Sequence, residues 1–244
     1  MIALLCSVQA EAELLLIKTA IRKTTIVGTK SIIQGILAGQ QILLCIGGIG
    51  KVNAAHAATL LFLQFIPEAL IIFGIGGAYP SSGARIGDVA IATKEIAGDE
   101  GVMTPDGFKD AECIGIPLIR TATSTVFTTY PAPDAFLRRS QQALVSYQGL
   151  GAAKIHVGSF VTLSTCTGTS AQARKLEGRY HGLCENMEGA AAAQVAELHN
   201  IPWFELRGIS NIVEDRNLDT WDIPAATDSV QRVIMHLLDF FAKQ

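Results

Sequence analysis

The stretch NMEGAAAAQVAELHNIPWFELRGISN, residues 186–211, decides the fold, because it joins a helix to a buried strand and places polar side chains at their ends. Small residues and good helix formers predict a helix that opens directly behind Glu188. An asparagine and a proline then end the helix. The apolar run 203–209 predicts a strand of a sheet that is covered on both faces. Asn211 is expected just past the carboxyl end of that strand.

Glu188 and Asn211 are therefore candidates for one ligand pocket. In open α/β sheets, ligands bind in the crevice outside the carboxyl ends of the strands. The alternative is that Glu188 is only an acid in a first helical turn, favoured by the helix dipole, and that Asn211 is only a loop residue that tolerates turns. Glu11, at the predicted turn between the first strand and the first helix, has the same two interpretations. Spacing alone leaves both open.

The composition predicts one α/β domain over residues 1–244, because no linker rich in Pro, Gly and Ser divides the 244 residues. Apolar residues make up 49% and charged residues 17% of the chain. This balance favours a large core and a buried interface, so we expect a homodimer or a higher homo-oligomer. The net charge of −3 and the lack of a basic stripe give no reason to expect nucleic acid, so we expect a small-molecule partner.

The amino terminus predicts neither a secretory signal nor a membrane anchor. It has no basic lead, Glu11 and Glu13 interrupt it, and no run of about 18 apolar residues follows. Five scattered cysteines show neither a disulfide framework nor a CxxC motif, and Cys6, Cys45 and Cys184 are expected to be buried thiols in a reducing cytoplasm. Without HExxH or a Cys/His cluster, no metal site is expected.

Apolar runs that alternate with amphipathic segments predict a mixed sheet covered by helices on both sides. Between residues 94 and 132 a long excursion is expected to cover the site or an interface. The predicted strands are residues 2–6, 31–37, 41–46, 69–73, 87–93, 155–163 and 203–209. The predicted helices are residues 11–20, one from about residue 51, 134–147, 171–180 with Ser170 as cap, one from residue 189, and 230–241.

Two glycine-rich segments, residues 47–50 and 74–80, follow predicted strands and suggest a pocket floored by backbone. Close packing of a small-residue helix on the sheet is the alternative for the first of them. Neither GxGxxG nor the phosphate loop GxxxxGK[ST] is matched, because Val52 follows Lys51 and no glycine has the required spacing before it. We therefore expect no nucleotide cofactor, and indeed no cofactor of any kind.

Six motifs in this order resemble the nucleoside phosphorylase and methylthioadenosine/adenosylhomocysteine nucleosidase superfamily. They are the first strand ending before Glu11, GGIGKVNAA, GIGGAYP followed by GDVAIAT, GSFVTLST, NMEG and RGISN. The resemblance covers nearly the whole chain and implies a three-layer nucleoside-phosphorylase-like α/β fold with a central mixed β-sheet flanked by helices. Within the superfamily, STCTGT and RGISN are most similar to the futalosine hydrolase branch.

The resemblance implies a role for each residue of the sugar and water sites. Glu188 would receive the ribose 2′- and 3′-hydroxyls. Met187, with Asn186 beside it in the same substrate-binding segment, would lie against the sugar face. Glu11 would position the attacking water and take its proton.

The resemblance also implies contacts to the base. Val161 and Thr162 match residues that contact it, and Phe160 would be an aromatic neighbour. Gly74, followed by Ile75 in the same substrate-binding turn, matches a position that is often serine in adenine-specific members. One hydroxyl contact would therefore be missing here.

Asn211 stands where adenine-specific members carry an aspartate that protonates N7 of the leaving base. A carboxamide cannot donate a proton in this way, but it offers a carbonyl acceptor and an NH2 donor side by side. Hypoxanthine presents a matching pair, O6 as acceptor and N7–H as donor once the glycosidic bond breaks. Asn211 thus favours a 6-oxopurine nucleoside over a 6-aminopurine nucleoside.

Three other functions stay open at this point. Phosphorolysis would need cationic or amide donors that converge on the anion, and Arg85 and Arg207 are isolated in the sequence. Hydrolysis of methylthioadenosine would need the acid that Asn211 replaces. A nucleoside-binding protein without turnover would tolerate Asn211, but it would not need both Glu11 and Glu188.

Overall fold

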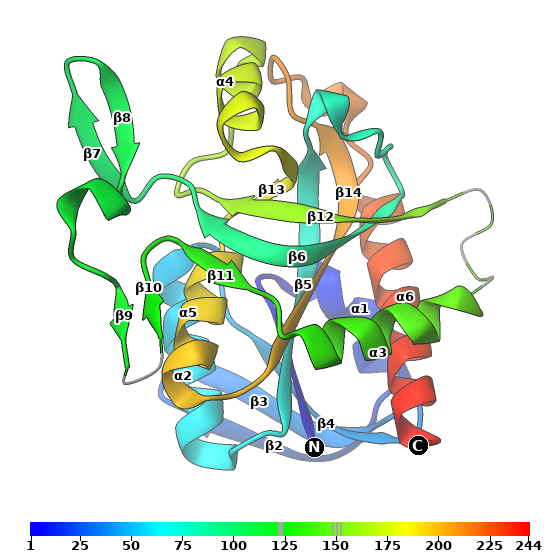
Figure 1. Ribbon diagram of the computed structural model, residues 1–244. Coiled ribbons are helices and arrows are strands. Elements are labelled where there is room, and N and C mark those ends of the chain that lie inside the picture. The colour runs from blue at the N-terminus through cyan, green and yellow to red at the C-terminus, as the bar shows by residue number, and fades with distance from the viewer. Residues whose placement is uncertain (122–123, 148, 150, 152) are drawn as a thin grey trace.

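Ten strands of the described chain form one mixed sheet, which Figure 1 shows at the centre of the protein. The computed structural model describes residues 1–121, 124–147, 149, 151 and 153–244. The strands of this sheet are β1 (Ile2–Cys6), β2 (Ala20–Val27), β3 (Lys30–Leu37), β4 (Gln40–Ile46), β5 (Ala69–Ala78), β6 (Val89–Ala97), β11 (Thr129–Pro131), β12 (Ile155–Thr162), β13 (Gly182–Asn186) and β14 (Trp203–Ile212).

The pairing of the strands brings three strand ends to one place. β2, β3, β4, β1 and β5 lie side by side, and β1 runs parallel to both β4 and β5. Beyond β5 the pairing closes a ring, from β5 to β14, β6, β12, β13 and back to β5. In this ring Gly77 near the end of β5 pairs with Asn211 of β14 on one side and with Glu185 of β13 on the other. The candidate site is built at this junction of strand ends.

Helices cover both faces of the sheet, as Figure 1 shows. On one face, α2 (Lys51–Phe65) packs against α5 (Gly189–His199) over a core that includes Leu61 and Ala192. On the other face, α1 (Glu13–Lys18), α3 (Asp134–Val145) and α6 (Ile223–Ala242) enclose a second core with Phe204 and Leu237. A smaller core lies beneath α4 (Ser170–Tyr180). The predicted three-layer α/β fold with a central mixed β-sheet flanked by helices is confirmed.

The long excursion predicted over residues 94–132 contains regular structure. It includes the end of β6, the hairpin of β7 (Gly101–Thr104) and β8 (Gly107–Asp110), the pair β9 (Ile119–Arg120) and β10 (Thr125–Val126), and β11 at the sheet edge. Residues 122 and 123 lie outside the described residues. The remaining short elements are the 3-10 turns η1 (Gln9–Ala12), η2 (Pro80–Ser82), η3 (Ala111–Ile114) and η4 (Leu218–Thr220). In the described part of the chain, no helix is both long and apolar enough to cross a membrane.

Three helix predictions need correction, and the first is α6, which begins at Ile223 and not at residue 230. The segment 11–20 is not one helix, because η1 and α1 end at Lys18 and β2 begins at Ala20. The β-branched run that follows favours an extended edge strand, which the sequence pattern concealed because most of β2 is exposed. The cap of α4 is Thr169, whose hydroxyl accepts the Gln172 amide, and Ser170 is the first helical residue.

Three strands extend further than predicted: β6 to Ala97 instead of residue 93, and two strands at the site. β5 does not end at Phe73 but continues through the glycine-rich segment to Ala78, where β13 and β14 pair with it. Glycine suits these positions because neighbouring groups approach the backbone closely: a Cβ on Gly74 would overlap Glu11, and one on Gly76 would overlap Cys184. Likewise Asn211 lies inside β14, not beyond it. Gly76 and Gly77 thus belong to the wall of the site, and Gly74 leaves room for Glu11.

Gly208→Ala is expected to destabilise the protein by about 1–3 kcal/mol or more, because a Cβ at this position of β14 would overlap the backbone carbonyl of Ala226 in α6. Urea unfolding checks this. The matched control is Gly178→Ala in α4, where no atom lies within 4 Å of the added Cβ and where alanine is expected to stabilise the helix by roughly 0.5–1 kcal/mol. Equal unfolding midpoints for the two variants would contradict the packing argument.

Candidate active site

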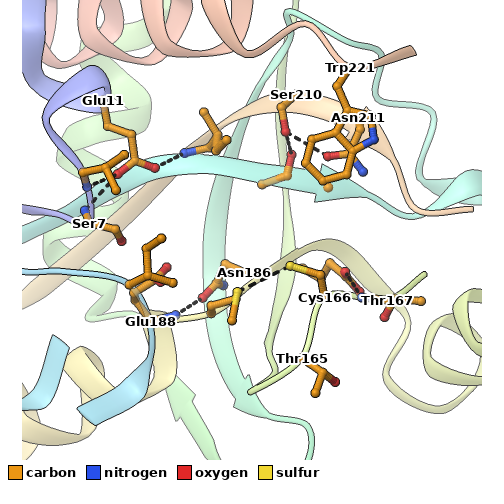
Figure 2. A pocket seen from close by; sticks show the side chains of 17 residues that line it. Ser7, Glu11, Thr165, Cys166, Thr167, Asn186, Glu188, Ser210, Asn211 and Trp221 are labelled. Atoms are coloured by element: carbon orange, nitrogen blue, oxygen red, sulfur yellow. Dashed lines mark hydrogen bonds between the residues drawn. The ribbon is translucent and has the colours of Figure 1, made fainter. Parts of the chain in front are cut away.

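A cavity of about 180 Å³ opens at the junction of β5, β13 and β14. Figure 2 shows the side chains around it, with Glu11 and Asn211 along one side and Glu188 with the segment 165–167 across from them. The residues that line it are Ser7, Val8, Glu11, Ile49, Ile75, Gly76, Gly77, Thr165, Cys166, Thr167, Glu185, Asn186, Met187, Glu188, Ser210, Asn211 and Trp221. The structure therefore brings Glu11, Glu188 and Asn211 to one cavity.

Glu11 is held in place by backbone amides. It lies in η1, directly after β1, and is 3% exposed. One carboxylate oxygen accepts the amides of Ser7 (2.8 Å) and Val8 (3.1 Å), and the other accepts the amide of Ile75 (2.9 Å). Burial raises the pKa of Glu11, and the Arg207 guanidinium with the three amides offsets only part of this rise. A fixed carboxylate of raised basicity suits a general base.

Glu188 occupies the N-cap position of α5, and its carboxylate is held from two sides. Its Oε1 accepts the amide of Gly50 at 2.8 Å, and its Oε2 lies 3.3 Å from Nη1 of Arg207. The backbone of the glycine-rich segment 47–50 thus contacts the carboxylate, as expected if this segment forms the floor of a pocket. Arg207 stays cationic, because Glu205, Glu188 and Glu11 together raise its pKa more than burial lowers it.

Asn211 reaches the cavity through an irregularity in β14. The register between β14 and β5 shifts between Ile209 and Asn211, so that both Ser210 and Asn211 line the cavity although they are consecutive. Such bulges re-aim side chains. The Asn211 Oδ1 accepts the Ser210 hydroxyl (2.8 Å), and its Nδ2 donates to the carbonyl of Ile212 (3.1 Å). Each end of the amide keeps one further hydrogen-bonding position.

The wall opposite Asn211 consists of the segment 165–167, which the sequence analysis did not assign to the site. Glu185 of β13 fixes this segment, since its Oε1 accepts the Thr167 amide at 2.9 Å. Burial raises the pKa of Glu185, and the hydrogen bonds from Thr167 offset part of the rise. The Cys166 thiol lies 3.5 Å from the sulfur of Met187, which also lines the cavity. The polar string STCTGT was the available signal for these residues, because it follows a strand end.

The contacts predicted for Phe160, Val161 and Thr162 are wrong in position. All three are fully buried in β12, which pairs with β6 on one edge and β13 on the other, and none of them lines the cavity. The chain leaves the sheet only after Thr162, so the residues beyond the strand reach the cavity.

Gly74 and Asn186 also need reassignment. Gly74 does not line the cavity, and Glu11 occupies the space that a side chain at position 74 would need. Its neighbour Ile75 does line the cavity and supplies the amide to Glu11. Asn186 lines the cavity too, but its Oδ1 accepts the amides of Glu188 (3.0 Å) and Gly189 (2.7 Å), so it holds the start of α5.

Among the described residues, no three His, Cys, Asp or Glu side chains come together in a way that could hold a metal ion. Comparison with known proteins places this geometry in a family. A model of the phosphorylase superfamily matches residues 1–242. The chain belongs to the phosphorylase superfamily. Its relatives in sequence are named as nucleosidases and hydrolases. Within the superfamily the chain is therefore an enzyme of the nucleosidase type.

Two relatives are similar in sequence to comparable degrees. The futalosine hydrolase of Acidothermus cellulolyticus is 33% identical over 182 residues, which are 74% of this chain and 68% of the relative. The 5′-methylthioadenosine/S-adenosylhomocysteine nucleosidase of Maridesulfovibrio salexigens is 30% identical over 241 residues, 97% of this chain and 98% of the relative. The two names differ in substrate, so similarity alone does not select one.

Solved structures share the fold. The 5′-methylthioadenosine/S-adenosylhomocysteine nucleosidase of S. pneumoniae with a transition-state inhibitor has a TM-score of 0.81 at 22% identity, and covers 98% of this chain and 99% of its own. The native futalosine hydrolase of Helicobacter pylori has a TM-score of 0.80 at 16% identity, with 98% and 97% covered. Both structures therefore support the architecture.

Proposed function

We propose that the protein hydrolyses the N-glycosidic bond of a 6-oxopurine nucleoside, and that its substrate is futalosine, which would yield hypoxanthine and dehypoxanthinyl futalosine in the alternative menaquinone pathway. The observation that carries this proposal is Asn211, a carboxamide that lines the cavity together with Glu11 and Glu188. The predictions of one domain, of a homo-oligomer and of a cytoplasmic location rest on the composition and belong to the same proposal.

Asn211 supports the choice of base. Its free NH2 hydrogen suits O6 of hypoxanthine, and its carbonyl suits N7–H of the departing base. An aminopurine would set its 6-amino group against the amide NH2 and leave a buried donor unpaired, at a cost of about 1–3 kcal/mol. The Ser210 hydroxyl supports this orientation, because it donates to the Asn211 carbonyl and thereby directs the NH2 group away from itself.

The proposed mechanism assigns one step to each acid. A water oxygen attacks C1′ of the ribose while its proton passes to Glu11, and the electron pair of the C1′–N9 bond stays with the purine. Glu188 accepts hydrogen bonds from the 2′- and 3′-hydroxyls and so fixes C1′ beside the water. The purine gains negative charge as the bond breaks, and the Asn211 NH2 group stabilises that charge at O6 before solvent protonates the base.

Water suits this cavity better than phosphate does as the attacking group. None of the lining residues named above is Lys or Arg. Arg207 behind the wall is 1% exposed and is engaged by Glu205 and Glu188. A phosphate beside Glu11 and Glu188 would face two acids without a cation to receive it. The apolar lining of Val8, Ile49 and Trp221 offers contact surface for an aryl or alkyl group on the nucleoside.

The test is a turnover panel of futalosine, inosine and methylthioadenosine, each with and without added phosphate, with chromatography of the released base. We expect the highest kcat/KM with futalosine, release of hypoxanthine, and no dependence on phosphate. Faster release of adenine from methylthioadenosine would overturn the choice of base. A ribose 1-phosphate product, or turnover only with phosphate, would overturn hydrolysis.

A further inference from the structure

Two carboxyl groups lie behind the cavity and have no role in the mechanism above. Glu95 of β6 and Glu205 of β14 are both fully buried, and neither lines the cavity. They meet beneath the first residue of α5: a Cβ on Gly189 would overlap oxygens of both. Position 189 therefore has to be glycine for this pair to exist under the helix that carries Glu188.

The charges around this pair do not balance if every group is ionised. Arg207 is the cation at the centre, with its Nε 2.8 Å from Glu205 Oε1 and its Nη1 3.3 Å from Glu188 Oε2. Glu11 also acts on the same guanidinium. Four buried carboxyls, Glu11, Glu95, Glu188 and Glu205, thus share one positive charge. Burial of uncompensated carboxylates is costly, so at least one of them is expected to hold a proton.

The hydrogen-bond donors and acceptors around the two carboxyls indicate that Glu95 holds that proton. The Thr162 hydroxyl lies 2.7 Å from Glu95 Oε2 and 3.0 Å from Asn186 Oδ1, but it has one proton to donate. It also accepts the amide of Ala190 at 2.7 Å. Meanwhile Glu205 Oε2, buried beside Glu95, has no donor among the described residues. Nη2 of Arg207 also lacks an acceptor among the described residues, so the missing donor is a local one between the two carboxyls, and a neutral Glu95 supplies it.

Glu205 is the ionised member of the pair, because it carries the direct contact to the guanidinium. Burial raises the pKa of Glu95 well above its ordinary value, and the neighbouring Glu205 adds to the rise. For Glu205 burial also raises the pKa, but Arg207 opposes this rise. The two environments thus separate the protonation states of two otherwise similar acids.

We propose that Glu95 and Glu205 form a carboxyl pair that shares one proton and positions the sugar-binding Glu188 through two arms. This proposal rests on the function proposed for Glu188. One arm runs from Glu95 to Asn186 (2.6 Å) and Thr162, which hold the amides at the start of α5. The other arm runs from Glu205 through Arg207 to the Glu188 carboxylate. Both acids are positioning residues, because neither touches the cavity.

Infrared spectroscopy tests the proton without any need for turnover. A protonated carboxylic acid has a carbonyl stretch that is separate from the carboxylate bands, so the difference between the wild-type and Glu95→Gln spectra near neutral pH should show this band. A difference spectrum without this band would overturn the shared proton. This result is independent of the substrate, so it remains decisive even if the protein hydrolyses no nucleoside in the panel.

Kinetics test the positioning role. Glu95→Gln mimics the neutral acid, so its kcat/KM should stay within about threefold of wild type, whereas Glu95→Leu removes the hydrogen bonds and should lose about 30-fold or more. Glu205→Gln removes the ionised partner of Arg207 and should also lose about 30-fold or more. On 2′,3′-dideoxyinosine, which offers Glu188 no hydroxyl, the losses of both damaging variants should shrink to about threefold, since the interaction they disturb is already missing.

Equal losses on the ribonucleoside and on the dideoxynucleoside would show a merely structural role and would overturn the proposal. So would a large loss in Glu95→Gln with a native circular dichroism spectrum. If Glu205→Gln and Glu95→Leu do not fold, Glu95→Gln decides, because full activity together with loss of the infrared band supports the pair. Wild-type inactivity on every nucleoside would instead count against the proposed function, and would leave the infrared result standing.

Discussion

Glu11→Gln is expected to lower kcat for nucleoside hydrolysis by about a hundredfold to ten-thousandfold, which is the usual contribution of a general base. Glutamine keeps the size of the side chain but cannot take the proton of the attacking water. The NH2 group of the glutamine would also face a backbone N–H, because both oxygens of Glu11 accept backbone amides, those of Ser7, Val8 and Ile75. Release of hypoxanthine under saturating nucleoside measures the effect.

Glu13→Gln is the matched control, because Glu13 is exposed in the first turn of α1, two residues away, and should be neutral. The wild-type pH profile gives a second check on the same group. Glu11 works as a base only when ionised, and burial raises its pKa above the ordinary 4.5. Activity should therefore fall as the pH drops through this raised pKa, earlier than for an exposed glutamate. Turnover by Glu11→Gln at the wild-type rate would rule out the assigned role.

Asn211→Asp is expected to change the base preference, by roughly fivefold to 150-fold in the ratio of kcat/KM for futalosine to kcat/KM for methylthioadenosine. In the variant an ionised carboxylate would replace the NH2 group that faces O6, so a carbonyl oxygen would meet negative charge. A 6-aminopurine would gain an acceptor for its amino group. The ratio of the two rates, measured in one mixture, reports the change directly.

Asn217→Asp adds the same charge at an exposed position in the turn before η4 and should leave the ratio unchanged. Circular dichroism of both variants controls for folding. If Asn211→Asp kept the wild-type ratio, Asn211 would not read the base, and the case for a 6-oxopurine would lose its main support.

Local chemistry explains which parts of the fold the sequence predicts. The helix behind Glu188 and its end at Asn200 follow from small residues, helix formers and a left-handed cap, and the structure has that cap at a φ of 54°. The buried strands follow from apolar runs. β2 escapes this reasoning, because an exposed edge strand has no apolar face to reveal it. The second half of β5, residues 74–78, escapes it as well, because its glycines signal a turn locally while Glu11 and Cys184 make them necessary in the strand.

The sequence by itself predicted the fold class and named three polar residues as candidates for the site, since strand ends, helix starts and motif order are local properties of the chain. Only the tertiary structure decided what surrounds them. The ring of strand pairing brings Gly77, Glu185 and Asn211 together, and it buries Glu95 and Glu205 beside Arg207. These groups come from strands far apart in sequence, so their distances and shared charge depend on how the sheet closes, and no local pattern encodes that closure.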